Sequence, residues 1–121
     1  MDTINERAFL FNYRLANLDL GTGVRVIGDF AFEEIAITEL VIPASVKYIY
    51  GAAFQNCRNL ERIYFMGKPD SISDYGFNTD GPSTTEVFVP WSEGEVPYAP
   101  WGLPQGTTIH YDCDPSEYPI S

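Results

Sequence analysis

The stretch Val46–Phe65, which reads Val-Lys-Tyr-Ile-Tyr-Gly-Ala-Ala-Phe-Gln-Asn-Cys-Arg-Asn-Leu-Glu-Arg-Ile-Tyr-Phe, is one complete copy of a pattern that the chain repeats. It predicts a short strand that ends at Ile49, a turn that buries its apolar residues, and a second strand with alternating apolar positions. The residues expected to point inward are Ile49, Ala53, Phe54, Leu60, Ile63 and Phe65. Because such a unit cannot bury its apolar faces alone, the stretch predicts a stack of similar units.

The phenylalanine of the turn makes the period visible along the chain. It recurs as Phe9, Phe32, Phe54 and Phe77, at spacings of 23, 22 and 23 residues. An isoleucine stands five residues before each one (Ile4, Ile27, Ile49, Ile72), and a small residue stands directly before it (Ala8, Ala31, Ala53, Gly76). The strand that follows recurs as the pairs Leu18/Leu20, Leu40/Ile42, Ile63/Phe65 and Val87/Val89. We therefore expect about four units of 22–24 residues, in which like strands stack in parallel and satisfy each other's backbone hydrogen bonds.

The second unit carries the most specific motifs. Its segments Ile27-Gly28-Asp29-Phe30-Ala31-Phe32 and Leu40-Val41-Ile42-Pro43-Ala44-Ser45-Val46 resemble the BspA-like leucine-rich repeat, whose units read roughly I-G-x-x-A-F and then L-x-x-I-x-I-P-x-x-V. The resemblance covers about residues 4 to 90. It implies a mainly β fold, a short right-handed leucine-rich-repeat solenoid with a parallel β-sheet on one side. Three departures bear on local turn geometry: Tyr50 replaces the first glycine, Phe65 with Met66-Gly67 replaces the Ile-Pro ending, and Gly76 precedes the last turn phenylalanine.

The carboxy-terminal segment departs from the pattern. Prolines at Pro90, Pro97, Pro100 and Pro104 cannot donate to a ladder, so this segment is expected to be a loop folded over the last unit. The residues 107–111, Thr-Thr-Ile-His-Tyr, then predict a closing strand. We expect a single domain over 1–121, with repeats over 1–90 and a Pro/Trp-rich cap with an acidic tail over 91–121.

A second resemblance concerns this ending. The run Pro-Trp-Ser-Glu-Gly-Glu-Val from Pro90, the run Ala-Pro-Trp-Gly from Ala99, and Thr-Ile-His-Tyr from Thr108 are similar to the carboxy-terminal ending of small repeat proteins encoded by phages and prophages of gut bacteria, often near tail genes. The resemblance implies a phage- or prophage-encoded protein. Its location would then be the virion, as a tail-associated protein, or the host cytoplasm.

Charge is distributed unevenly along a chain whose formal net charge is -10. All seven Lys and Arg residues lie in the first 68 positions beside eight acids, which gives 7 - 8 = -1, and nine acids without a basic residue follow from Pro69. Such a field repels nucleic acid and anionic membranes, and it favours a basic protein partner or serves solubility alone. No apolar run is long enough for a membrane helix, and the opening Met-Asp-Thr-Ile-Asn-Glu lacks the pattern of a signal peptide.

The sequence contains none of the common motifs of catalysis and cofactor binding. The chain has no Gly-x-Ser-x-Gly, no phosphate-binding glycine loop and no Cys-x-x-Cys, and its one histidine, His110, is expected to have a structural role in the closing strand. Asp74, Asn78 and Asp80 lack the alternating carboxylates of a calcium loop. Cys57 and Cys113 make no disulfide framework. The sequence therefore predicts a non-enzymatic protein without metal or cofactor.

A candidate binding face follows from the period. If Leu40, Ile63 and Val87 point inward, strand alternation places two rows outward. The first row is Asp19, Val41, Tyr64 and Phe88, and the second is Asn17, Glu39, Arg62 and Glu86. An exposed Val-Tyr-Phe row flanked by charge predicts a protein-binding surface formed by Glu39, Val41, Arg62, Tyr64, Glu86 and Phe88. Ordinary cross-strand packing is the alternative interpretation.

Three functions stay open at this point. The first is a non-enzymatic protein-binding or structural module, phage-encoded and associated with the virion tail. The second is an acidic inhibitor of a host nucleic-acid-binding defence protein, in which carboxylates imitate phosphates. The third is a fragment of a bacterial surface adhesin. An open strand edge at the first unit would also allow the chain to pair with itself as a homo-oligomer.

Overall fold

A computed structural model describes residues 3–4, 23–32, 37–54, 57, 60–77, 86–96, 101–103 and 106–118 of the chain. Within these ranges the regular structure is almost entirely strand: β1 (Thr3–Ile4), β2 (Val26–Ile27), β3 (Glu39–Ile42), β4 (Tyr48–Ile49), β5 (Arg62–Phe65), β6 (Ser71–Ile72), β7 (Glu86–Phe88) and β8 (Thr108–His110). One 3-10 turn, η1 (Pro115–Glu117), follows in the tail. None of the described residues forms a helix long and apolar enough to cross a membrane.

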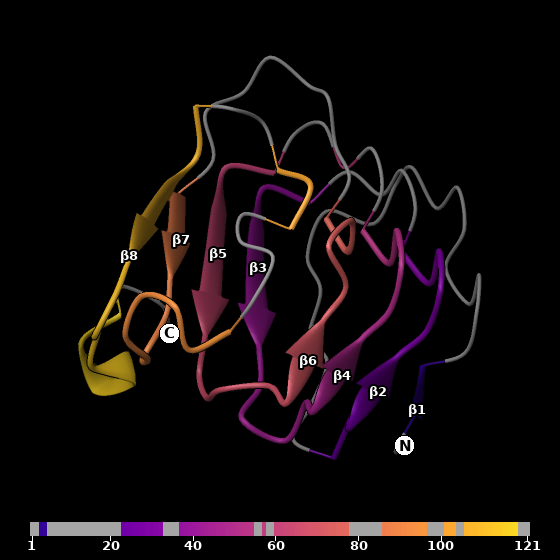
Figure 1. Ribbon diagram of the computed structural model, residues 1–121, viewed down its shortest axis with the longest axis horizontal. Coiled ribbons are helices and arrows are strands. Elements are labelled where there is room, and N and C mark those ends of the chain that lie inside the picture. Colours follow the sequence, from indigo (N-terminus) through magenta and orange to yellow (C-terminus); the bar gives the residue numbers. More distant parts are fainter. Residues whose placement is uncertain are drawn as a thin grey trace.

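The strands form two parallel sheets (Figure 1). A short-strand sheet has the order β1-β2-β4-β6, and a long-strand sheet has the order β3-β5-β7-β8. From β2 to β7 the chain passes alternately from one sheet to the other, so the neighbours within a sheet are equivalent strands of successive units. The expected parallel stacking of like strands is confirmed for these strands. The first unit's Phe9, Leu18 and Leu20 lie outside the described residues.

Strand register places the apolar residues of each unit above one another. Leu40 pairs with Ile63 and Ile63 with Val87 in the long-strand sheet, and all are fully buried. In the short-strand sheet Ile27, Ile49 and Ile72 form the equivalent row. The six residues assigned inward from the sequence (Ile49, Ala53, Phe54, Leu60, Ile63, Phe65) are each at most 2% exposed, which confirms the repeat register. The two sheets therefore share one core.

The turn phenylalanines stack into a column inside this core. The ring centroids of Phe32 and Phe54, and of Phe54 and Phe77, are both 5.1 Å apart with nearly parallel planes. Backbone hydrogen bonds tie the turns together, from Phe32 N to Ala53 O at 2.7 Å and from Phe54 N to Gly76 O at 3.0 Å. The backbone of these turns donates from the same position to the next unit. The stacking of the rings explains why the residue at this position is a phenylalanine and why it recurs at a nearly constant spacing.

The ladder of hydrogen bonds between turns continues beyond the part of the chain in which the repeat was expected to end. Phe77 N donates to Trp101 O at 2.9 Å, so Trp101 takes the place that Gly76 takes opposite Phe54. The Trp101 ring meets Phe77 edge-on, with centroids 6.4 Å apart and planes at 61°, and Val96 and Trp101 are both buried. The sequence prediction of a loop over the last unit missed this continuation, because the prolines hide it. The expected closing strand is confirmed as β8, which pairs in parallel with β7.

The hydrogen bond that closes the turn is kept where Tyr50 and Gly76 depart from the family motif, although Phe30 and Ala52 have a positive φ of 56° and the equivalent Tyr75 does not. Ala31 N donates to Gly28 O at 3.2 Å, and the equivalent bonds to Tyr50 O and Ser73 O measure 3.4 and 3.1 Å. Tyr50 is accepted in place of glycine because its side chain points to solvent. The cysteines are both free: Cys57 is buried with its Sγ 3.3 Å from Phe32 O, and Cys113 is half-buried.

Candidate functional site

The outer face of the long-strand sheet brings the predicted site residues together in two rows. Register pairs Glu39 with Arg62, Arg62 with Glu86, and Glu86 with Thr108. The second row pairs Val41 with Tyr64, Tyr64 with Phe88, and Phe88 with His110. The structure therefore places the six predicted residues as neighbours on β3, β5 and β7, while Asn17 and Asp19 lie outside the described residues. Strand β8 extends both rows, and the same alternation applied to the closing strand would have found Thr108 and His110.

The charged row is exposed and internally paired. Arg62 Nε donates to Glu39 Oε2 at 2.8 Å, with both side chains about two-fifths exposed. This hydrogen bond and the negative charge of Glu39 raise the pKa of the Arg62 guanidinium above its ordinary value. At the other end of the row, His110 Nε2 lies 4.0 Å from Glu86 Oε1. Exposed pairs of this kind add little stability, but they fix the direction of the charged groups.

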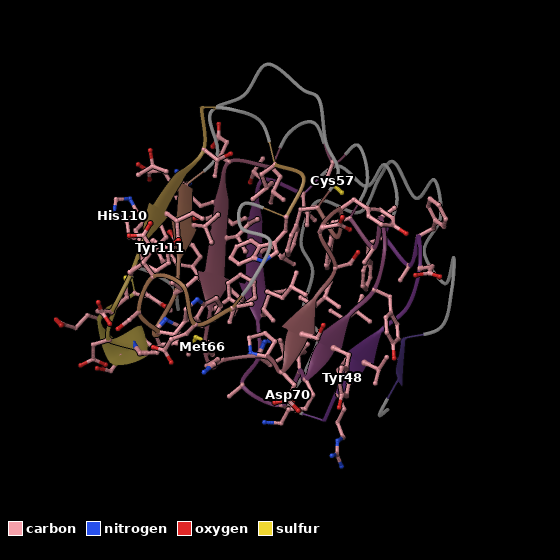
Figure 2. The ribbon with its side chains drawn as sticks, viewed as in Figure 1. Tyr48, Cys57, Met66, Asp70, His110 and Tyr111 are labelled. Atoms are coloured by element: carbon pink, nitrogen blue, oxygen red, sulfur yellow. The ribbon has the colours of Figure 1, made fainter. Side chains whose placement is uncertain are left out.

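The aromatic row is a continuous stack across three strands. Ring centroids of Tyr64 and Phe88 are 5.0 Å apart, and those of Phe88 and His110 are 4.6 Å apart, with planes within about 11° of parallel. Parallel strands bring one residue of each unit to the same height, so offset stacking follows directly from the register. Figure 2 shows His110 on β8, at the end of this sheet, and Tyr111 directly after the strand.

The tail covers the middle of the aromatic row. Tyr118 lies with its ring centroid 5.2 Å from Tyr64 and 6.2 Å from Phe88, and its hydroxyl donates to Phe65 O at 2.8 Å and to Phe88 O at 3.2 Å. Tyr64 is therefore only 1% exposed, and the expectation of an exposed Val-Tyr-Phe row is wrong at this residue. Val41 and Phe88 remain half-buried. Burial raises the pKa of Tyr64, and it raises the pKa of Tyr118 to about 12.

Backbone contacts hold the tail in this position. Asp112 N donates to Trp91 O at 2.8 Å, and Cys113 N donates to Val89 O at 2.9 Å. Asp114 then begins η1 by accepting from Ser116 N at 3.0 Å. Hydrogen bonds from the Ser116 hydroxyl and backbone lower the pKa of the Asp114 carboxyl. The repeat pattern does not predict that the tail returns to the sheet. Tyr118 is therefore a residue of the site that the sequence prediction missed, and the sequence contains no signal that would have identified it.

The face has the chemistry of recognition. Its groups are carboxylates, a guanidinium, an imidazole and stacked rings on a regular sheet, and these are the groups that carry specificity and contact area in protein interfaces. Within the described ranges no three His, Cys, Asp or Glu side chains are placed to hold a metal ion.

Comparison with known proteins gives one finding. The family described as the BspA type leucine rich repeat region (6 copies) matches residues 1–93. No curated protein and no solved structure matches the chain. The matched range contains β1 to β7, whereas β8, η1 and Tyr118 lie beyond it.

Proposed function

Because this chain belongs to the BspA-type leucine-rich repeat family, whose repeats commonly serve in protein binding or in structural roles, we propose that it is a non-enzymatic protein-binding module. Its binding surface is the outer face of the long-strand sheet. The observation that carries the proposal is the meeting of Glu39, Arg62 and Glu86 in one exposed row beside the row of Val41, Tyr64 and Phe88.

The two rows divide the work of recognition. Alternating charges at Glu39, Arg62 and Glu86 select the orientation of a partner, and Arg62 is already held by Glu39 before binding, which reduces the entropy lost on binding. The half-buried edges of Val41 and Phe88 supply apolar contact area beside these charges. Tyr64 supports the ring of Phe88 and does not itself contact the partner, because Tyr118 covers it.

The genetic setting that we propose is a phage or prophage, with the protein in the virion tail or in the host cytoplasm. The resemblance of the ending that follows residue 90 to those of small phage and prophage repeat proteins supports this setting. We also propose that the ending caps the single domain. Trp91 and Trp101 are buried, and their ring centroids lie 5.1 and 6.0 Å from that of Phe65. Two tryptophans in these positions would close the core that the last regular unit leaves open.

An acidic inhibitor of a nucleic-acid-binding protein is the second candidate. Its support is a set of exposed carboxylates in the last third of the chain, namely Glu86, Glu93, Asp112, Asp114 and Glu117. Glu95 differs from them in being paired with a lysine: Lys68 Nζ donates to it at 3.0 Å, Ser92 N donates to it at 2.8 Å, and these bonds lower the pKa of its carboxyl. A phosphate mimic would lose its partner steeply as salt rises, whereas the sheet face would lose it weakly.

The test is affinity capture of host-cell proteins on the immobilised chain, followed by calorimetry with each purified partner. We expect Arg62→Glu to weaken the partner's binding at least tenfold, because it reverses the charge in the centre of the row. Arg25→Glu is the matched control, since it makes the same charge change at an exposed residue of the other sheet. A partner that binds the Arg62→Glu variant as tightly as the unaltered chain would remove the long-strand face from consideration.

A further inference from the structure

Exposed large apolar side chains gather on the other sheet. In the described part of the chain they are Tyr48, Tyr50 and Tyr75, which are 40, 48 and 52% exposed, and we name these three the tyrosine ridge. All three belong to β4 and to the turns that follow β4 and β6. Tyrosine is enriched in interfaces because it offers a large rigid ring with a polar tip at a low cost in conformational entropy.

Strand alternation makes Tyr48 and Tyr50 neighbours on the outer face. They stand on either side of the buried Ile49, and their rings are nearly parallel, with centroids 6.4 Å apart. The ladder continues past β4, because Tyr50 N donates to Ile27 O at 3.0 Å. Figure 2 shows Tyr48 on the short-strand sheet, well away from His110 on β8. The tyrosine ridge is therefore separate from the outer face of the long-strand sheet.

Small residues surround the two rings. Tyr48 pairs with Val26 on one side and Ser71 on the other. One step past the strands, Gly28 and Ser73 take the places on either side of Tyr50, as the shared turn hydrogen bonds show. Because the residues beside them are glycine, serine and valine, Tyr48 and Tyr50 remain exposed to a ligand. Tyrosine, serine and glycine are also the residues that dominate antibody binding loops.

Gly51 fixes the third ring. A Cβ atom at Gly51 would lie 2.5 Å from Tyr75 Cε2, so the Tyr75 ring occupies the space that any other residue at this position would fill. The contact holds the Tyr75 ring against the turn at Gly51, the residue that follows Tyr50. A ring that is already positioned loses less freedom when a ligand binds to it.

Charge distinguishes the two ends of the ridge. Asp29 and Asp74 stand at the turn position equivalent to Gly51, three residues before each turn phenylalanine, and both are exposed. Neither makes an ion pair with another described residue. At the opposite end, the positions directly before β2, β4 and β6 hold Arg25, Lys47 and Asp70. Because Asp70 offsets only one of the two positive charges there, a cation is favoured more beside Tyr50 and Tyr75 than beside Tyr48.

We propose that the tyrosine ridge is a second docking surface, and that its occupant is an arginine-bearing segment of a basic partner protein. The guanidinium lies against the exposed rings of Tyr50 and Tyr75 and near the carboxylates of Asp29 and Asp74, whose positions stand on either side of Gly51 in the row of turns. Arginine fits better than lysine because its planar, weakly hydrated group stacks on aromatic rings. The net charge of -10 draws a basic partner and repels a second copy of this chain.

The probes are two blocked peptides of equal charge, hexa-arginine and hexa-lysine, titrated by calorimetry at fixed salt. The arginine peptide is expected to bind the unaltered chain more tightly. The double variant Tyr50→Ala/Tyr75→Ala should weaken its binding about 4- to 25-fold, that is about two- to fivefold for each ring, and should remove the preference over lysine. Tyr50→Leu/Tyr75→Leu keeps the bulk without the ring and should behave as the alanine variant, whereas Tyr50→Phe/Tyr75→Phe should retain the preference.

Two further variants sharpen the test. Gly51→Ala displaces the Tyr75 ring without removing it, and should cause a partial loss of the arginine preference. Glu117→Gln removes an exposed carboxylate from η1, outside both sheet faces, and should lower the affinities for both peptides equally. Far-ultraviolet circular dichroism shows that each variant is folded. Equal binding of the two peptides, failure of both to bind, or full retention by the leucine variant would overturn the proposal.

Discussion

Replacing Tyr118 by phenylalanine removes one hydroxyl and leaves in place the ring that covers Tyr64. That hydroxyl donates to the carbonyl oxygens of Phe65 and Phe88, at 2.8 and 3.2 Å. One donor shared between two acceptors corresponds to one net hydrogen bond, so the free energy of unfolding should fall by about 1 kcal/mol. For a chain of this length the melting temperature should fall by about 4 °C.

Replacing Tyr118 by alanine should cost more, because the ring is lost as well. Its contacts with Tyr64 and Phe88 are worth about 0.5–1.5 kcal/mol each beyond the area they bury, so a total loss of about 3 kcal/mol is expected. Urea unfolding followed by circular dichroism measures both variants against the unaltered chain. If Tyr118→Ala unfolds at the same urea concentration as the unaltered chain, the tail does not rest on the sheet and the account given for the burial of Tyr64 is wrong.

The same hydroxyl predicts a pH dependence. Burial raises the pKa of Tyr118 to about 12, above the value of about 10 in an unfolded chain, so the folded state holds the proton more tightly. Its contribution to stability is complete below about pH 10 and is lost as the pH rises towards about 12. Tyr118→Phe should therefore show a shallower loss of stability than the unaltered chain over this interval. Identical slopes would contradict the buried hydroxyl.

Three further substitutions test the core, a turn and the charged row, and urea unfolding measures the effect of each on stability. Phe54→Ala empties a fully buried position stacked between two other phenylalanines, and should cost about 3–5 kcal/mol; an unchanged midpoint would contradict the repeat register. Gly76→Ala should stabilise the chain by about 0.5 kcal/mol, because the new Cβ meets methyl groups of Ile49 and Ile72 at 3.4 Å and the equivalent position of the other units holds alanine; a loss of stability would mean that the turn does not accept a side chain. Arg62→Gln breaks an exposed ion pair and should change stability by less than about 1 kcal/mol, so a larger loss would show that the charged row is structural.

Periodicity made most of the fold predictable. One phenylalanine for each unit fixed the turns, and alternation from Leu40, Ile63 and Val87 fixed which strand residues face inward. Parallel stacking then determined which residues of successive units are neighbours, including the rows through Arg62 and Tyr64. These inferences hold because each depends only on contacts between equivalent positions.

The parts that could not be predicted depend on contacts that occur once. Trp101 continues the ladder of turns by accepting from Phe77 N, but the segment around it is rich in proline and does not carry the motif of the regular units. The exposure of Tyr64 was mistaken because it is decided by Tyr118, which is 54 residues further along the chain and belongs to no unit. A repeat predicts which way a side chain points, and only the structure shows what lies on top of it.

This cover separates two ways in which a partner could use the long-strand face. A partner that contacts the Tyr64 ring must first displace Tyr118, so its apparent affinity is reduced by the free energy that holds the tail down. Tyr118→Ala should then tighten the binding of such a partner by about 5- to 150-fold, the equivalent of about 1–3 kcal/mol, whereas a partner that contacts only the row of Glu39, Arg62 and Glu86 should bind as before. The variant remains usable because a loss of about 3 kcal/mol is smaller than the stability of most domains. Calorimetry with the same purified partner and both proteins distinguishes the two cases, and weaker binding to Tyr118→Ala would exclude both, because the tail would then itself be part of the contact.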